Sequence, residues 1–599
     1  MDRFYNLLFP KAEPAEPPAM AINDESRKEV RKRTPIPLSF ELMRQTEIFI
    51  EETLYPQAFT LLLDALSSGN VSSESGTVAS TPVVIPQPQH LAIAATMLVH
   101  PFTTTRARLD AEKEAPNIAL RLLRLTNALV GPTAAQFHTA FAFTHFETSR
   151  NGKLRADSPA LNGTMCEDKR TGWEASYSGG RSVWNEAEDF WHAVGWALNC
   201  SVLHQAQWKH WHLWLQFMCQ VLEDDWEDRA AKYTQAQEEE LLQRSHEEAP
   251  SGVEPAEQGI HKKSGRPRKG DAKQDDGLEI YRQSLIFQYI TSNDTFGRDR
   301  RIMRSIFADG TPRSAEFRAV FEDEIKNPRD KSSSNKKKRV GVDLSKGEYG
   351  DYQNDSHEDY ASSGKESSRP VAMAPGRQLR QTKRSRRARN TKGGATDSDA
   401  ELTDTAVDHN NGIGSLGGYN SLALRQRLLG LLFKVSATLP KDFTSPNEIS
   451  HMLAENIRDL PLPVFQHMVT PSNLPRLGPD EHCSLCQSLF RFMVESSARA
   501  PPPGNDLLTQ SDLEKYYFPY KAASPSTASN AKISILLEAM MTLLHNEKMM
   551  SATPELKEAA RVGVERRESA CHSHSGSVEA AYLRESHFRI WFMIDFILP

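Results

Sequence analysis

The sequence has little of what marks secreted, membrane-spanning or disulfide-bonded proteins. Six cysteines are spread over 599 residues, mostly in apolar, helix-like contexts, which suits a reducing compartment. The longest apolar run, Ile590 to Ile594, stops at Asp595 and is far shorter than the roughly 20 residues of a membrane-spanning helix. The first residues lack a signal-peptide pattern, because their short apolar run ends at Pro10. We therefore expect an intracellular protein without membrane contact.

An excess of basic charge is also missing. The chain has 72 Lys and Arg residues against 78 Asp and Glu residues, which gives a formal net charge of −6. This balance excludes a protein that coats nucleic acid with its whole surface. The basic residues nevertheless cluster, so any basic function must be local.

Signatures of enzymes and of bound cofactors are absent as well. We find no phosphate-binding P-loop, no H-E-x-x-H zinc motif and no G-x-S-x-G elbow. The sequence therefore predicts no enzymatic activity, no cofactor and no small-molecule substrate. An unrecognised helical enzyme stays open as a third hypothesis, after the two functions given at the end of this section. Gly412 to Gly417 fits the dinucleotide-binding spacing G-x-G-x-x-G, but residues 403–410 before it do not read as a strand, so a flexible linker end is the better interpretation.

Metal-binding patterns are weak. Cys483 and Cys486 follow His482, and Cys571, His572 and His574 lie 85 residues further on, which makes a four-ligand zinc site improbable. Asp189 and His192 share one helix face but have no second copy elsewhere. We interpret these histidines and cysteines as core or surface residues, and we predict no metal site.

The apolar residues follow helical spacing in most of the chain. Ile118, Leu122, Leu125 and Leu129 lie on one face of a predicted helix that starts at Pro116 and stops at Gly131. Residues 184–228 are rich in tryptophan, and a stripe recurs at helical spacing, formed by Trp208, Trp211, Leu215, Met218 and Leu222. Such a stripe is typical of a buried helix face, and the segment predicts a helical hairpin. Helix starts are predicted at the capping boxes of Ser445 and Ser511.

The fold class is therefore mainly α, with two irregular, solenoid-like helical domains separated by a long disordered basic and polar segment that contains a short helical island. No strand alternation of any length is present. The expected segments are a disordered tail 1–36, a helical domain 37–235, a disordered stretch 236–276, the island 277–326, a disordered basic and acidic linker 327–418 and a C-terminal helical domain 419–599.

The island carries three short helical patterns around a turn, which is the outline of a helix-turn-helix unit. Its last pattern is crowded with carboxylates that would repel phosphate: Glu316, Glu322, Asp323 and Glu324. We therefore prefer a structural or docking unit over a DNA reader.

One basic stretch points to a specific partner. Gly265 and Pro267 favour an extended backbone, and Arg266 and Arg268 flank the proline, within a set of residues that also includes Lys262, Lys263 and Lys269. The narrow minor groove of A·T-rich DNA is strongly negative and attracts inserted arginine. The stretch resembles the AT-hook of high-mobility-group A chromatin proteins, whose core is Gly-Arg-Pro with basic flanks. The resemblance covers about nine residues, departs at Ser264, and implies binding to A·T-rich DNA.

Two further basic runs resemble nuclear import signals. The first is formed by Lys336, Lys337, Lys338 and Arg339, and the second by Lys383, Arg384, Arg386, Arg387 and Arg389. Both lie in the segment expected to be disordered, where an import receptor can bind an extended chain. Ser398, three residues before Glu401, resembles an acidophilic kinase site whose phosphate would mask the second run.

Taken together, these features predict a nuclear, chromatin-associated scaffold subunit. Its helical domains would bind protein partners in a nuclear complex, and the AT-hook-like stretch would tether it to A·T-rich DNA. The alternative is a nuclear protein–protein adaptor without DNA contact, in which all basic runs serve import only.

Overall fold

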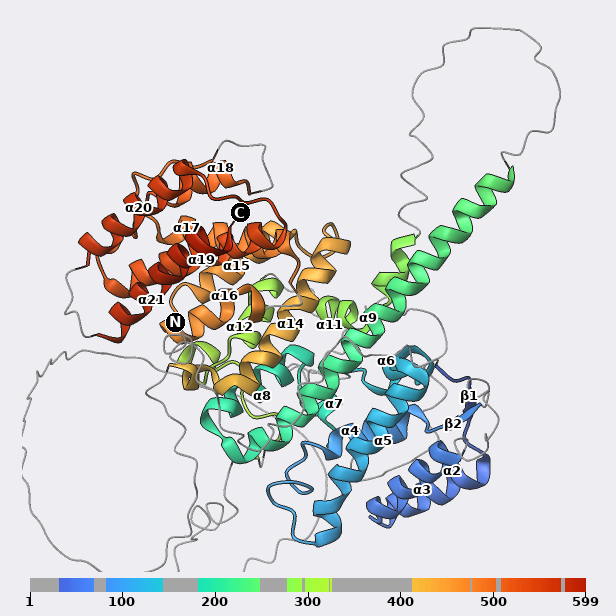
Figure 1. The fold of residues 1–599 in the computed structure, drawn as a ribbon. Coiled ribbons are helices and arrows are strands. Elements are labelled where there is room, and N and C mark those ends of the chain that lie inside the picture. Colours follow the sequence, from blue (N-terminus) through green and yellow to red (C-terminus); the bar gives the residue numbers. More distant parts are fainter. Residues whose placement is uncertain are drawn as a thin grey trace, which may run out of the picture. The chain divides into compact units, whose positions relative to one another are not determined.

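Two consecutive helices, α8 (Phe190–Leu203) and α9 (Gln205–Glu247), form a tryptophan-rich hairpin (Figure 1). Helix α8 starts where the side chain of Asp189 accepts a hydrogen bond from the backbone N–H of His192, 2.7 Å away. Indole side chains bury on the order of 200 Å² each. The predicted stripe is buried, with every member at most 8% exposed: Trp208, Trp211, Leu215, Met218 and Leu222.

The structure is a computed structural model that describes residues 32–68, 82–143, 181–247, 277–292, 297–322, 324–325, 412–473, 477–501, 508–571 and 577–598. It is mainly helical, which confirms the predicted fold class. Among the described residues, no helix is both long and apolar enough to cross a membrane.

The helices that precede the hairpin in the sequence build the first region. They pack in pairs, α2 on α3, α3 and α4 on α5, and α5 on α9. The elements are α2 (Phe40–Glu51), α3 (Tyr55–Ser67), α4 (Pro88–Met97), α5 (Asp110–Ala134), α6 (Phe137–Ala140) and α7 (Val183–Glu186).

Two features of this region differ from the sequence-based expectation. Strands β1 (Pro35–Pro37) and β2 (Val83–Ile85) form a two-stranded parallel sheet, and strands of three residues are too short to show an alternating pattern. Helix α5 starts at Asp110 rather than at Pro116. The Glu112 carboxylate accepts hydrogen bonds from the backbone N–H groups of residues 108 and 109, and these caps set the start. The predicted stop is correct, because Gly131 has a non-helical φ of 79°.

The segment predicted as a separate helical island, at 277–326, packs against both helical regions instead of standing alone. It comprises a helix at 277–282, α11 (Leu285–Thr291), α12 (Arg298–Ile306) and the 3-10 turn η4 (Pro312–Ser314). Helix α12 packs on α8 and also on α14 and α15 of the following region. Gly195 of α8 allows the residues after η4 to approach, since a Cβ atom there would lie 2.3 Å from the ring of Phe317.

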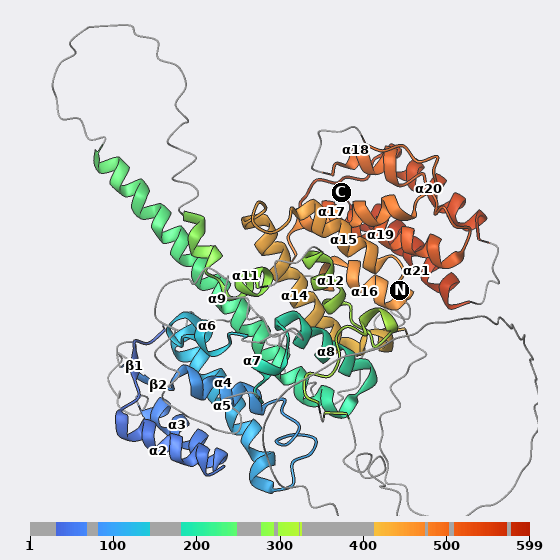
Figure 2. The same cartoon turned by 180° about the vertical axis from the view of Figure 1, so that it is seen from behind.

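The C-terminal region is a stack of helices in which α15 packs on α17, α17 on α19, and α19 on both α16 and α21 (Figure 2). Its elements are η6 (Ile413–Leu416), α14 (Gly418–Thr438), α15 (Pro446–Ile457), α16 (Leu462–Val469), η7 (Pro471–Asn473), α17 (Pro479–Met493), α18 (Gln510–Asp512), η8 (Leu513–Tyr517), α19 (Thr527–Asn546), α20 (Pro554–Ser569), α21 (Val578–Phe592) and η9 (Met593–Ile597). The capping box of Ser445 is confirmed. The cap predicted at Ser511 is formed by Thr509 with Asp512 instead.

The described residues of both helical regions fall within one compact unit. Helix α14 packs on both α8 and α9. Two ion pairs cross the contact: Arg427 Nη2 lies 2.7 Å from the Glu223 carboxylate, and Arg282 Nε lies 3.1 Å from that of Asp442. The regions predicted as separate domains at 37–235 and 419–599 therefore share one fold.

A buried arginine lies at this contact. Arg425 of α14 is 0% exposed. Its guanidinium donates to the carbonyl oxygens of Ile306, Ala308 (2.8 Å) and Leu416 (3.3 Å) and to the hydroxyl of Ser421 (3.2 Å). Burial lowers the pKa of Arg425 to about 9, which leaves the side chain charged at neutral pH. The charge is thus balanced by backbone dipoles at the end of α12 and by η6.

Helix α9 extends beyond the elements that pack against it (Figures 1 and 2). It ends at Glu247, past the boundary at residue 235 expected from composition. Residues 234–239 are all exposed, so this extension has no apolar face in the core. Glutamine, glutamate and leucine favour helix, which explains why a polar segment continues it.

Replacing Arg425 with methionine should strongly destabilise the unit, because the carbonyl oxygens of three residues lose their donor. We expect a loss of about 3–5 kcal/mol in the free energy of unfolding, measured by urea denaturation. The control is Arg561→Met, which removes an exposed arginine paired with Glu558 and Glu565 and should change stability little. Equal losses in the two variants would contradict the role of Arg425.

Candidate functional site

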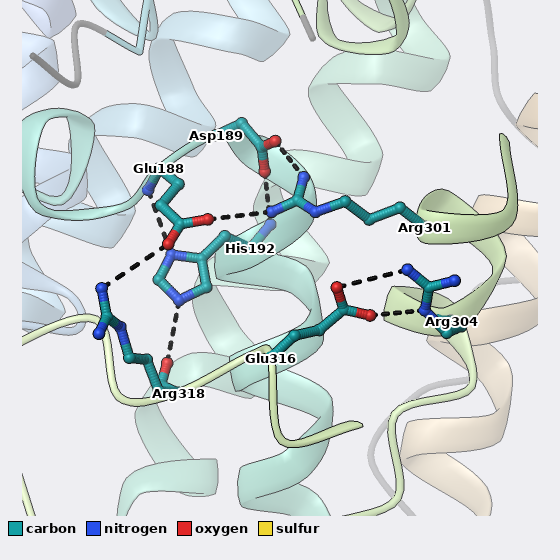
Figure 3. A network of polar contacts seen from close by, with 7 residues as sticks. All are labelled: Glu188, Asp189, His192, Arg301, Arg304, Glu316 and Arg318. Carbon is teal, nitrogen blue, oxygen red and sulfur yellow. Dashed lines mark hydrogen bonds and ion pairs between the residues drawn. The ribbon is translucent and has the colours of Figure 1, made fainter. Parts of the chain in front are cut away.

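Acidic and basic side chains join the start of α8 to the segment around α12 (Figure 3). Arg301 of α12 binds the Asp189 carboxylate through Nη1, and its Nη2 lies 3.2 Å from Glu188 Oε2. Arg318 adds an ion pair to Glu188 at 3.8 Å. Asp189 is 2% exposed, so its charge depends on Arg301 and on the N-terminal N–H groups of α8 for compensation.

His192 lies inside this network with both ring nitrogens engaged. Its Nδ1 accepts from the backbone N–H of Glu188 at 3.1 Å, and its Nε2 lies 3.1 Å from the carbonyl oxygen of Arg318. The neutral ring with its proton on Nε2 satisfies both contacts. Burial lowers the pKa of His192, although Glu188 and Asp189 oppose this effect. The ring is therefore a structural link, and neither nitrogen is available to a metal or a substrate.

A second pair in the same view is more exposed. Arg304 Nε lies 2.5 Å from Glu316 Oε1, and both side chains are more than one third exposed. Such surface pairs contribute little stability. Glu316 thus faces a cation of its own segment.

Glu324, one of the carboxylates expected to repel phosphate, lies in the core. Its carboxylate is 3% exposed and accepts hydrogen bonds from the indole N–H groups of Trp196 (3.0 Å) and Trp211 (2.6 Å). Burial raises the pKa of Glu324 to about 7, and the two indole hydrogen bonds oppose this rise. The sequence does indicate that an acceptor is needed, because buried tryptophans usually require one for their N–H. The spacing of residues does not identify Glu324 as that acceptor.

Ser534, His587 and Glu568 form a chain of hydrogen bonds between α19, α21 and α20. Ser534 Oγ lies 3.0 Å from His587 Nε2, and His587 Nδ1 lies 3.1 Å from Glu568 Oε1. This order of hydroxyl, imidazole and carboxylate is the one used by serine hydrolases. Sequence reasoning missed it, because the three residues lie on different helices.

The surroundings of this chain argue against nucleophilic catalysis. Ser534 is 0% exposed and His587 is 4% exposed, so a substrate has no access to the hydroxyl. Burial and the nearby Arg567 lower the pKa of His587 to about 4, whereas an efficient general base titrates near the working pH. The arrangement satisfies buried polar groups and links three helices.

The residues considered as zinc ligands are engaged or separated. His482 is buried, and its Nε2 lies 2.7 Å from the carbonyl oxygen of Val469. Burial raises the pKa of Cys483 to about 12 and that of Cys486 well above its usual range. Among the described residues, no group of three or more His, Cys, Asp or Glu side chains could hold a metal ion. His572 and His574 lie outside the described residues.

The G-x-G-x-x-G spacing falls on an ordered turn that belongs to the fold. Residues 413–416 form the 3-10 turn η6, which packs on α8, α14 and α16. Gly417 lies so close to Ser201 that a Cβ atom would be 2.0 Å from its hydroxyl. The turn is therefore a packing element, and the interpretation of 412–417 as a flexible linker end is wrong.

Most of the predicted site residues lie outside the described part of the chain. These are the AT-hook-like residues Lys262, Lys263, Gly265, Arg266, Pro267, Arg268 and Lys269, the import residues Lys336, Lys337, Lys338, Arg339, Lys383, Arg384, Arg386, Arg387 and Arg389, and Ser398. The structure does describe where the chain leaves and re-enters the fold around the AT-hook-like stretch, at Glu247 and at residue 277.

An apolar surface lies on the last helix. Phe588, Phe592 and Phe596 are 54%, 44% and 78% exposed, and their rings stack in sequence with centroids 6.3 Å and 5.4 Å apart. We call these three residues the aromatic ridge. It exposes on the order of 350 Å² of side chain, which is the size of the largest apolar patch on many monomers, and such patches are often functional.

Comparisons with known proteins found no match: no protein-family model, no curated protein and no solved structure is similar to this chain. The candidate sites therefore rest on the geometry of this chain.

Glu324 should make stability depend on pH. Its pKa in the folded state is raised above the unfolded value, so its contribution is fully present below pH 4.5 and is lost as the pH rises through about 7. We expect the wild type to lose on the order of 3 kcal/mol over this range relative to Glu324→Gln, measured by urea denaturation at several pH values. Glu316→Gln is the control and should keep the wild-type dependence. An unchanged pH profile in Glu324→Gln would refute the assignment.

Ser534 should not react with a fluorophosphonate probe, because its hydroxyl is fully buried within α19. We expect no labelling of the folded protein by mass spectrometry, with a serine hydrolase as the positive control. Labelling that disappears in Ser534→Ala would show that the hydroxyl is accessible and nucleophilic.

Proposed function

We propose that the protein is a nuclear, chromatin-associated scaffold subunit. Its helical unit binds protein partners, and residues Lys262–Lys269 contact the minor groove of A·T-rich DNA. The proposal rests on the resemblance of this stretch to an AT-hook and on the way the fold holds the two ends of the segment that carries it.

Helix α9 holds both ends of that segment. The chain leaves the helix at Glu247 and returns beside its middle, where the ring centroids of Tyr233 and Tyr281 lie 5.2 Å apart. The returning chain is fixed by Arg229, which donates to the carbonyl oxygen of Ile280 at 3.0 Å, and by the Asp225 carboxylate, which accepts from the N–H of residue 285 at 2.8 Å.

This anchoring has a mechanical consequence for a bound duplex. The 14 residues from Tyr233 to Glu247 carry the exit point about 21 Å along the helix axis. The AT-hook-like stretch lies in sequence between the end of α9 and this fixed point beside Tyr233. DNA held by Arg266 and Arg268 would be tied to the helical unit rather than to a free tail.

The charges of the stretch set the strength of binding. Its five basic residues predict a log–log salt slope of roughly −4 to −5, which is weak binding at physiological salt. The import-like runs at 336–339 and 383–389 lie on the same chain and raise the effective concentration of cations near a bound duplex. We propose that these two runs also bind an import receptor, and that phosphorylation of Ser398 masks the second run, at 383–389.

Protein binding is supported by the aromatic ridge. Phe588, Phe592 and Phe596 provide an apolar surface, as in protein–protein contacts. Within the described residues, the polar clusters of Asp189, Glu324 and Ser534 are engaged in internal contacts.

DNA binding should depend on the arginines that flank Pro267. In anisotropy titrations across salt, we expect the full-length protein to bind A·T-rich duplexes more tightly than G·C-rich ones. The double variant Arg266→Ala/Arg268→Ala should lose this preference, and its log–log slope should fall by about 2.

The matched control is Lys383→Ala/Arg384→Ala, which removes two positive charges from another basic run. It should lower the slope without changing the preference for A·T. If neither the wild type nor the control prefers A·T-rich DNA, the DNA proposal fails and the adaptor without DNA contact is the better description.

A further inference from the structure

The end of the central segment packs against the tryptophan-rich hairpin without forming a helix. We call the described residues after η4, 315–322 and 324–325, the strap. Its apolar side chains are buried, since Phe317 is 1% exposed, Val320 is 4% exposed and Phe321 is 5% exposed. The strap is the last part of the chain that the structure describes before residue 412.

The first half of the strap, at 315–318, is held through its backbone by side chains of α8. Asn199 donates to the carbonyl oxygen of Phe317 at 3.0 Å, and His192 Nε2 lies 3.1 Å from that of Arg318. Arg425 fixes the chain a few residues earlier, at the carbonyl oxygen of Ala308.

The second half of the strap, at 319–322 and 324–325, depends on Glu324. Its carboxylate accepts from the indole N–H groups of Trp196 in α8 and Trp211 in α9, and its carbonyl oxygen accepts from Gln207 at 3.3 Å. Among the described contacts, every hydrogen bond from this half to the hairpin goes to Glu324. A single carboxyl side chain therefore joins the end of the strap to both helices.

The surroundings of this carboxylate disfavour its charge. Burial raises the pKa of Glu324 to about 7, and the indole hydrogen bonds and the charge of Arg106, between α4 and α5, oppose this rise. The Cys200 thiol of α8 also lies near it, and burial raises the pKa of this thiol well above its usual range, which keeps it neutral.

The histidines next to the strap change charge at lower pH. Burial lowers the pKa of His100, whose ring contacts that of Phe321, to about 4. Burial also lowers the pKa of His192 and that of His204, whose ring contacts Trp196. Glu324 is therefore the group in contact with the strap whose charge changes around neutral pH.

We propose that Glu324 is a pH-sensitive latch, and that the second half of the strap detaches locally from the α8–α9 hairpin as this carboxylate becomes ionised. The first half stays bound through Asn199 and His192. Detachment exposes the indoles of Trp196 and Trp211 at the point where the chain leaves the described fold. The inference does not depend on DNA binding or on nuclear location.

The direction and the size of the effect follow from linkage. A carboxyl group whose pKa is raised in the closed state stabilises that state fully below its ordinary pKa of 4.5, and this contribution is lost as the pH rises through about 7. With these two values, the equilibrium constant for opening rises about tenfold between pH 6 and pH 8 and levels off at higher pH.

The test is amide hydrogen exchange of the full-length protein, corrected for intrinsic exchange rates at each pH. We expect the protection of peptides that contain Phe321 and Glu324 to fall about tenfold from pH 6 to pH 8. At each pH it should stay at least about a hundredfold below that of α12 peptides, because the opening is local. Protection that does not change with pH would overturn the latch, and equal protection of strap and α12 would show that the strap opens only with the whole unit and would overturn it too.

Two variants separate the latch from other effects of pH. Glu324→Gln cannot ionise, so the protection of its strap should be the same at pH 6 and pH 8. The matched control is Glu322→Gln, which removes an exposed carboxylate of the same strap and should keep the tenfold change. A pH dependence that persists in Glu324→Gln, or that disappears in Glu322→Gln, would assign the effect to another group and refute the proposal.

Discussion

The buried charge of Arg425 is the constraint on which the fold depends. A guanidinium without contact to water must be surrounded by acceptors, since an uncompensated buried ion costs several kcal/mol. Its acceptors come from the end of α12, from η6 and from its own helix α14. The end of α12 is separated from η6 and α14 by more than a hundred residues of sequence. The charge can be buried only when all of them have assembled, so Arg425 couples the folding of the central segment to that of the C-terminal region.

The central segment is held by a second buried ion at its other end. Glu324 accepts hydrogen bonds from two indole groups of α8 and α9, while Arg425 donates to backbone carbonyls beyond α12. The hydrogen bonds to both groups come from dipoles: backbone carbonyls and a hydroxyl for Arg425, and indole N–H groups for Glu324. Asp309 and Arg106 add attraction to Arg425 and Glu324, respectively. This explains how a segment with only short helices is placed uniquely between two larger helical regions.

The sequence predicted the features that depend on local periodicity and on caps. The stripe of Trp208 and Trp211 is buried, the cap of Ser445 forms, and the break at Gly131 is present. It failed where the deciding contact is distant or irregular. Pro116 suggests a helix start, although capping by Glu112 starts the helix at Asp110, six residues earlier. Residues 277–326 suggest an island, because nothing in their sequence indicates that Arg425 donates to the carbonyl oxygen of Ile306. The inward position of Glu324 and the chain from Ser534 to Glu568 depend on tertiary contacts of the same kind.

That both ends of the peptide at 326–411 belong to one fold has a consequence for cleavage of that peptide. The chain leaves the described structure after residue 325 and re-enters it at residue 412, and the contacts of Arg425, Arg427 and Arg282 join the two sides. Backbone cleavage between these positions would not separate the halves, because none of these contacts passes through the connecting peptide. We expect the two products to remain associated as a heterodimer through these contacts. The connecting peptide thus sets the stoichiometry and the local concentration of the halves. The contacts of the buried charged residues are what make the two halves complementary.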